Sequence, residues 1–307
     1  MTRRRSLPAL VTLAAALTTA WLSSDVAGSA PAQGRAASAP QGGAAARGLR
    51  LYVFDGGVLE SDPGRYELTA KDVGTTQLSI ASFLVVHPRG VLMWDSGAVT
   101  DADWKPTGKP TVQRLTLSDG QERQVTIEKS LQSQLAASGF KVADVTHLVL
   151  SHYHWDHTAN ANVFAHATWL VRQEERDAMF GPTQGTSRPG TFSALKNSKT
   201  TIVKDEDHDV FGDGTVVLKR AAGHTPGHQV LFLKLPRTGN LMLSGDLYHY
   251  RAERALGKLP TFEFNKEQTT ASRKVIEAFL TKTGAQLWIQ HELDAHRKLK
   301  KAPEYYD

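Results

Sequence analysis

The segment Ser151–His157 reads Ser-His-Tyr-His-Trp-Asp-His and places three imidazoles and one carboxylate within six consecutive positions. It follows a largely apolar run, Val145–Leu150, that predicts a buried strand, and it leads into the small and polar residues Thr158–Asn160. Polar side chains crowded at the end of a buried strand cost free energy unless they are paired. Neutral imidazole and carboxylate are ligands of Zn²⁺ and similar ions. The segment therefore predicts a metal site rather than a solvated histidine-rich turn.

The pattern His-x-His-x-Asp-His resembles the signature of the metallo-β-lactamase fold superfamily. The resemblance implies an α/β fold, a four-layer αββα sandwich, with metal ions at one edge between two sheets. It also implies three ligands further along the chain: a histidine on a tight turn, a bridging carboxylate at a strand end, and a last histidine.

Three residues match these expected ligands. His224 lies in the glycine- and proline-containing turn Ala-Gly-His-Thr-Pro-Gly-His, where His228 is expected to be a structural neighbour. Asp246 follows an apolar strand, and His291 follows the last predicted strand, with His296 as a rival five residues later.

The resemblance implies two Zn²⁺ ions, or other divalent metals, as cofactors. One metal would take His152, His154 and His224, the other would take Asp156, His157 and His291, and Asp246 would bridge both. Coordination lowers the pKa of water to about 7, which supplies hydroxide for hydrolysis. Asp156 is also the implied catalytic residue that passes a proton to the leaving oxygen. Asp95, in Asp-Ser-Gly, matches an aspartate that orders the ligands from behind.

Within the superfamily, the chain is most similar to the N-acyl-homoserine lactonases. The likeness rests on Leu51–Phe54, on the metal segment through Asn160, and on a tail with His291-Glu292 and Pro303–Tyr306. It implies a zinc-dependent enzyme that opens the lactone ring of N-acyl homoserine lactones with a metal-bridging hydroxide, an activity known as quorum quenching.

The chain departs from the lactonases at one position. Those enzymes place a substrate-binding tyrosine three residues after the bridging aspartate, where this chain has His249, between Tyr248 and Tyr250. We predict Tyr248 as the catalytic tyrosine, with His249 and Tyr250 as alternatives. An apolar acyl-chain wall is predicted from the following residues: Tyr248, Leu256, Leu259, Phe262 and Phe264.

The same metals also suit other hydrolases, with an aryl ester, a phosphotriester or a β-lactam as substrate. A thioesterase of the glyoxalase II type is disfavoured, because only a short tail follows His291. A metal-binding or storage protein is disfavoured by the complete ligand set with its bridging carboxylate.

The N-terminus predicts export. Residues 1–32 combine an arginine cluster, an apolar stretch and an Ala-x-Ala site, which is typical of a cleaved signal peptide, so we expect a periplasmic or secreted protein without a membrane anchor. Residues 33–47 lack large apolar side chains and predict a flexible linker. The catalytic domain is expected at residues 48–307.

Composition narrows the partners. The chain has no cysteine, which excludes thiolate metal ligands and disulfides. The formal charge of +5 falls to +3 without residues 1–32, which contain three arginines and one aspartate. With no basic stripe, nucleic acid is not an expected partner. A small lactone or ester is expected, and the oligomeric state is left open.

Local patterns predict the secondary structure. Apolar or alternating runs predict strands at 51–57, 77–86, 91–94, 145–150, 169–171, 216–218, 230–233, 240–243 and 286–289. Helical spacing predicts helices at 127–137, 174–180 and 268–281.

Overall fold

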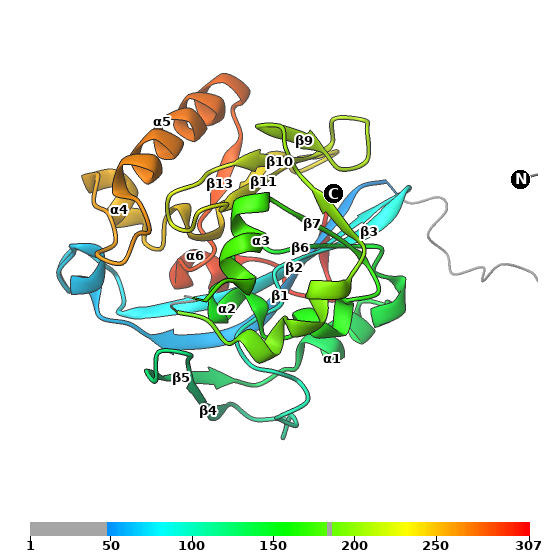
Figure 1. The fold of residues 1–307 in the computed structure, drawn as a ribbon, viewed down its shortest axis with the longest axis horizontal. Helices are drawn as coiled ribbons and strands as arrows, with labels where there is room; N and C mark the ends of the chain where they lie inside the picture. Colours follow the sequence, from blue (N-terminus) through cyan, green and yellow to red (C-terminus); the bar gives the residue numbers. More distant parts are fainter. Residues whose placement is uncertain (1–47, 183–185) are drawn as a thin grey trace, which may run out of the picture. The chain divides into compact units, whose positions relative to one another are not determined.

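The structure is a computed structural model that describes residues 48–182 and 186–307. The predicted signal peptide (1–32) and linker (33–47) lie outside the described residues. Two β-sheets lie face to face, and helices cover their outer faces (Figure 1). This arrangement confirms the predicted four-layer αββα sandwich.

The first sheet has the strand order β4-β5-β1-β2-β3-β6-β7-β8, and β14 pairs with the start of β1. Its strands are β1 (Arg50–Glu60), β2 (Gln77–His87), β3 (Gly90–Trp94), β4 (Thr111–Thr116), β5 (Glu122–Ile127), β6 (His147–Val149), β7 (Thr168–Val171), β8 (Thr200–Ile202) and β14 (Tyr305–Tyr306). Strands β3, β6, β7 and β8 run parallel, so β3 and β6 end at the same edge of the sheet.

The second sheet has the order β13-β12-β11-β10-β9. Its strands are β9 (Asp207–Asp209), β10 (Val216–Arg220), β11 (Gln229–Leu235), β12 (Gly239–Leu243) and β13 (Gln286–Trp288). Strands β12 and β13 are parallel, which brings their carboxyl ends together.

The core between the sheets explains the uninterrupted apolar character of β2. Phe83 and Val85 pack towards the second sheet, whereas Leu84 and Val86 pack towards the helices outside the first sheet. A strand buried on both faces reads as a continuous apolar run. All four side chains are buried.

The helices are α1 (Leu131–Ala137), α2 (Trp155–Thr158), α3 (Gln173–Phe180), α4 (Arg251–Leu256), α5 (Lys266–Thr283) and α6 (Leu293–Lys298). Helix α5 packs Ile276 and Leu280 on the outer face of the second sheet, and α1 and α3 lie on the outer face of the first (Figure 1). The short 3-10 helices are η1 (Pro63–Tyr66), η2 (Val142–Asp144), η3 (Ala161–Phe164), η4 (Pro189–Thr191), η5 (Ser193–Asn197) and η6 (Gly245–Leu247). Within the described residues, no helix has the length and apolar character needed to cross a membrane.

Two local predictions were wrong, and one hairpin was missed. Strand β1 does not stop at Gly56 and Gly57 but continues to Glu60 through an irregularity in its pairing with β2. The hairpin β4–β5 was missed, because its exposed positions are mostly polar. The helix predicted from Ile127 begins only at Leu131, since Ile127 ends β5 and Ser130 caps the helix.

Candidate metal centre

The metal segment leaves the first sheet at the carboxyl end of β6. Asp95, at the end of the neighbouring parallel strand β3, accepts hydrogen bonds from the backbone N–H of Ser151 at 2.6 Å and from its hydroxyl at 2.9 Å. Asp95 has a backbone φ of 56°, a left-handed conformation that aspartate tolerates better than most residues. These bonds fix the start of the segment before it enters α2.

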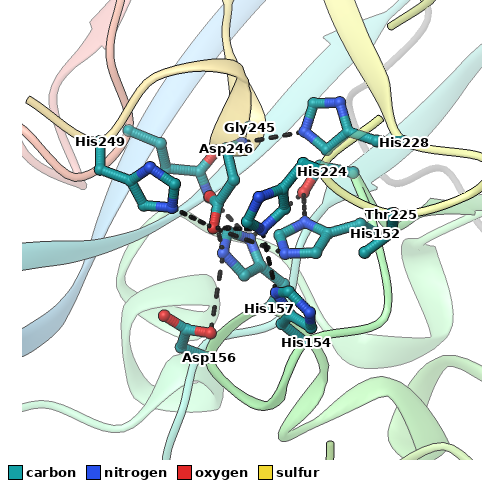
Figure 2. Close-up of polar contacts among 12 residues, drawn as sticks. His152, His154, Asp156, His157, His224, Thr225, His228, Gly245, Asp246 and His249 are labelled. Carbon is teal, nitrogen blue, oxygen red and sulfur yellow. Dashed lines mark hydrogen bonds and ion pairs between the residues drawn. The ribbon is translucent and has the colours of Figure 1, made fainter. Parts of the chain in front are cut away.

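The seven predicted ligands come together at the edge between the two sheets. They form two adjacent groups, in each of which the ligand atoms lie within 4.8 Å of one another: His152, His154, His224 and Asp246 in the first, and Asp156, His157 and His291 in the second. Figure 2 shows the labelled side chains of both groups gathered around Asp246. His224 follows β10, Asp246 follows β12 and His291 follows β13, so both sheets contribute.

The Asp246 carboxylate lies between the two groups. Its Oδ2 is 3.5 Å from Nε2 of His152 and 3.3 Å from Nε2 of His224. Its Oδ1 is 3.1 Å from Nε2 of His157 and 3.0 Å from Nε2 of His291. One carboxylate oxygen therefore faces each group, which is the placement that a bridging ligand requires.

The donor set fits divalent metal ions. Among the described residues, His152 Nε2 is buried without a hydrogen-bond partner, and a buried polar atom without a partner costs about 1–3 kcal/mol. Burial and the neighbouring imidazoles lower the pKa of His152 and His154 well below the ordinary value. A lowered pKa favours the neutral imidazole in these two rings, which is the form that binds metal. The two groups and the shared carboxylate make a dinuclear metal site.

Three outer groups fix the orientation of the histidine rings. Asp95 Oδ2 lies 2.9 Å from Nδ1 of His157, which confirms the predicted supporting role of Asp95. Nδ1 of His224 lies 2.8 Å from Glu263 Oε1, and Nδ1 of His291 donates to the backbone carbonyl of Ser79 at 2.7 Å. In each case the opposite nitrogen, Nε2, is left facing the centre.

His228 behaves as the expected structural neighbour. Its Nδ1 donates to the carbonyl of Ala221 at 3.0 Å, and its Nε2 accepts the backbone N–H of Asp246 at 2.9 Å (Figure 2). Burial lowers the pKa of His228 to about 3. The neutral ring therefore positions the backbone of the bridging residue.

A cavity of about 500 Å³ opens onto the centre. It is lined at its base by His154, Asp156, Asp246 and His291. His249 also lines it, with Nε2 3.1 Å from Asp246 Oδ2 and the ring stacked on His291 at 5.5 Å between centroids.

Tyr248 does not reach the cavity. Its ring is buried beneath the guanidinium of Arg273, and its hydroxyl donates to Glu277 Oε1 at 3.0 Å on helix α5. The position of Tyr248 therefore does not support the predicted contact with substrate, because β-strand geometry at residue 248 turns its side chain to the side opposite His249.

The predicted acyl-chain wall is largely wrong. Of its five members only Phe262 lines the cavity, whereas Leu256 and Phe264 are more than half exposed. Leu59, Tyr66 and Leu78 supply the apolar lining instead. They belong to β1, β2 and η1, and the sequence of these segments contains no motif that would indicate a substrate contact. Glu263 was also missed, because a single glutamate in a loop has no sequence signal.

The sequence profile of the metallo-beta-lactamase superfamily matches residues 75–283 of this chain. The chain belongs to this superfamily. The match covers the metal segment, the His224 turn and Asp246, and of the seven grouped residues only His291 lies outside it.

Individual members of the superfamily are similar over most of the chain. The N-acyl homoserine lactonase AttM of Azorhizobium caulinodans is 29% identical over 272 residues, which cover 84% of this chain and 99% of that protein. The N-acyl homoserine lactonase AiiA of Bacillus thuringiensis subsp. kurstaki is 24% identical over 257 residues, which cover 83% of this chain and 98% of that protein.

Two solved structures share the metallo-beta-lactamase fold. An N-acyl homoserine lactone hydrolase with its product N-hexanoyl-L-homoserine at the catalytic metal centre superposes with a TM-score of 0.68, at 20% identity over 83% of this chain and 98% of the other. The dizinc quorum-quenching lactonase AidC superposes with a TM-score of 0.58, at 18% identity over 84% of this chain and 94% of the other.

Proposed function

We propose that this chain is a dinuclear zinc hydrolase that opens the lactone ring of N-acyl homoserine lactones. The observation that carries the proposal is the Asp246 carboxylate, with one oxygen towards each histidine group. The relatives named N-acyl homoserine lactonase, which match this chain along nearly their whole length, support the choice of substrate.

The residues that would hold the metals are the seven of the two groups. Bound there, divalent ions lower the pKa of water to about 7 and polarise the ester carbonyl. A cavity of about 500 Å³ lies within the size range of small-molecule sites and leaves room for an acylated lactone.

The protein side chains transfer the proton, orient the substrate and form the apolar wall of the cavity. Asp156 lines the cavity, so its carboxylate oxygen takes the proton of the attacking water and returns it to the ring oxygen as the C–O bond breaks. His249 presents its ring beside Asp246, where it orients the lactone carbonyl. Leu59, Tyr66 and Phe262 form the apolar part of the wall.

A substrate panel tests the proposal. The purified protein, with zinc or cobalt restored, is given N-hexanoyl-homoserine lactone, an aryl ester, a phosphotriester and a β-lactam. We expect the lactone to have the highest kcat/KM and each chain to hold two metal ions. Two bound metals without lactone opening would refute the lactonase assignment and favour one of the other substrates.

We also propose that the protein is exported and that the mature chain begins after residue 32. The support is the sequence of the leader alone. Intact-mass analysis of the protein from the periplasm and from the culture medium tests this, and an unprocessed N-terminus on the cytoplasmic protein would contradict it.

A further inference from the structure

Two arginines line the cavity above the metal centre. They are Arg65 of η1 and Arg123 of β5, and both are partly buried. The guanidinium of Arg65 lies 4.6 Å from the centroid of the Phe262 ring. Arg123 donates to the Glu122 carbonyl at 3.0 Å and to Gln121 Oε1 at 2.5 Å. Neighbouring groups therefore hold both side chains at the cavity wall.

Neither guanidinium has a carboxylate partner among the described residues. Other arginines of the chain do: Arg220 pairs with Glu174, Arg254 with Glu277, and Arg273 with Glu253. Arg65 and Arg123 form no ion pair within 4.0 Å in the described part of the chain, although both border a cavity with charged walls.

Five acidic residues line the same cavity: Asp156 and Asp246 lie buried at its base in the metal centre, and Glu60, Asp62 and Glu122 are exposed and accept hydrogen bonds from other donors. Glu60 accepts from Gln77, Asp62 accepts the backbone N–H of Gly64 and Glu122 accepts from the Thr116 hydroxyl. They therefore do not neutralise the two arginines by direct contact.

The placement of Arg123 is electrostatically unfavourable. Burial lowers the pKa of Arg123, and the nearby charge of Arg65 lowers it further, while Asp119 and Asp156 act in the opposite direction. Two like charges on one partly desolvated wall repel each other. An anion bound between them removes this repulsion, and a carboxylate matches the planar fork of a guanidinium.

We propose that Arg65 and Arg123 form a subsite for a carboxylate that the substrate carries away from its ester bond. This inference rests on the proposed lactonase function and specifies its substrate class: lactones whose acyl chain ends in a carboxylate. The reacting ester lies over Asp246 and His291, and the acyl chain extends along the cavity to the two guanidinium groups.

The test compares two lactones that differ only at the chain end. N-hexanoyl-homoserine lactone ends in a methyl group, and N-adipoyl-homoserine lactone has a carboxylate in its place. For the wild type we expect a kcat/KM about tenfold or more higher for the adipoyl lactone, the gain of one charged hydrogen bond. The preference is to shrink as salt is added, because ions screen the partly exposed subsite.

Four variants locate the effect. Arg65→Gln and Arg123→Gln are each expected to reduce the preference severalfold while leaving kcat/KM for the hexanoyl lactone nearly unchanged, and Arg65→Lys is expected to retain part of it. Arg114→Gln is the matched control, since it removes an exposed charge from β4 of the same hairpin that is not part of the cavity lining.

A binding measurement separates this inference from the lactonase proposal. Calorimetry on the metal-loaded protein compares adipate with hexanoate, and the advantage of the second carboxylate is expected to vanish in Arg65→Gln and Arg123→Gln. If neither lactone is opened, the lactonase proposal fails and calorimetry still decides the subsite. If both lactones are opened equally and adipate has no advantage, or if Arg114→Gln loses the preference equally, the subsite does not exist.

Discussion

The carboxylate of Glu175 accepts a 2.8 Å hydrogen bond from the backbone N–H of Tyr153, between the first two histidines of the metal segment. The same buried carboxylate accepts the N–H of Gly227 at 2.8 Å and the hydroxyl of Thr225. One side chain from α3 therefore ties the loop that carries His152 and His154 to the turn that carries His224.

Glu175→Gln is expected to destabilise the protein and weaken its hold on metal. The N–H groups of Tyr153 and Gly227 bind different carboxylate oxygens, and an amide has only one oxygen. One buried N–H then faces an NH₂ group, which lowers the free energy of unfolding by about 1–3 kcal/mol near pH 4.5. Urea unfolding and metal analysis measure both effects. The control is Glu174→Gln, which removes a partly exposed ion pair with Arg220 that contributes about 1 kcal/mol or less. Equal losses of stability and of bound metal in the two variants would show that Glu175 has no special role.

The stability of the protein is expected to depend on pH through Glu175. Burial raises the pKa of this carboxyl from 4.5 to about 7, against its hydrogen-bond donors. The unfolded chain ionises first, so the contribution of Glu175 is full below pH 4.5 and is lost as the pH rises through 7, a change on the order of 3 kcal/mol. The difference in unfolding free energy between wild type and Glu175→Gln should therefore narrow from pH 4.5 to 7.5. A constant difference would mean that Glu175 does not titrate in this range.

Asp246→Asn is expected to lose both bound metal and turnover. The substitution keeps the shape of the side chain but removes the charge and one of the two oxygens that face the histidine groups. We expect fewer than two metals per chain and kcat/KM lower by about a thousandfold, since metal activation contributes several kcal/mol. Plasma emission analysis and lactone assays measure these. Full activity with two metals retained would contradict the bridging assignment.

Substitution of Tyr248 is expected to affect mainly stability, whereas substitution of His249 is expected to affect mainly catalysis. Tyr248→Phe removes a hydroxyl that binds Glu277, so it should lower stability by about 1 kcal/mol with little effect on kcat. His249→Ala removes a ring from the cavity wall beside Asp246, and kcat/KM should fall by about a hundredfold. The reverse outcome would restore the substrate role that the sequence predicts for Tyr248.

Arg273→Met is expected to destabilise the fold more than Arg254→Met. Arg273 pairs with the fully buried Glu253, which also contacts His249, whereas Arg254 pairs with the partly exposed Glu277. An uncompensated buried carboxylate costs about 3–5 kcal/mol, and an exposed pair contributes about 1 kcal/mol or less. The check is the thermal unfolding midpoint of the two variants, measured at the same metal concentration.

The sequence predicted the parts of the centre that are encoded in short motifs. His152, His154, Asp156 and His157 follow one strand closely, so their proximity follows from the local chain alone. The family pattern then indicated His224, Asp246 and His291, and the structure brings them all together.

The cavity wall was not predictable in the same way. Which of Tyr248 and His249 faces the substrate depends on the backbone after η6, and a change of one residue reverses the side on which a side chain lies. Leu59 and Tyr66 line the cavity together with residues of β5, a strand that pairs with β1 over a long sequence separation. Such tertiary placement leaves no local pattern in the chain.

The ligands that follow β6 belong to the first sheet, and those that follow β10, β12 and β13 belong to the second. A chain without cysteine has no disulfide between its two sheets, so metal ions held by residues of both sheets would be the cross-link at this edge. The last of the seven residues in the chain is His291, which follows β13. A nascent chain therefore assembles all seven only after His291 has been synthesised and both sheets have formed, which makes retained metal a reporter of finished folding.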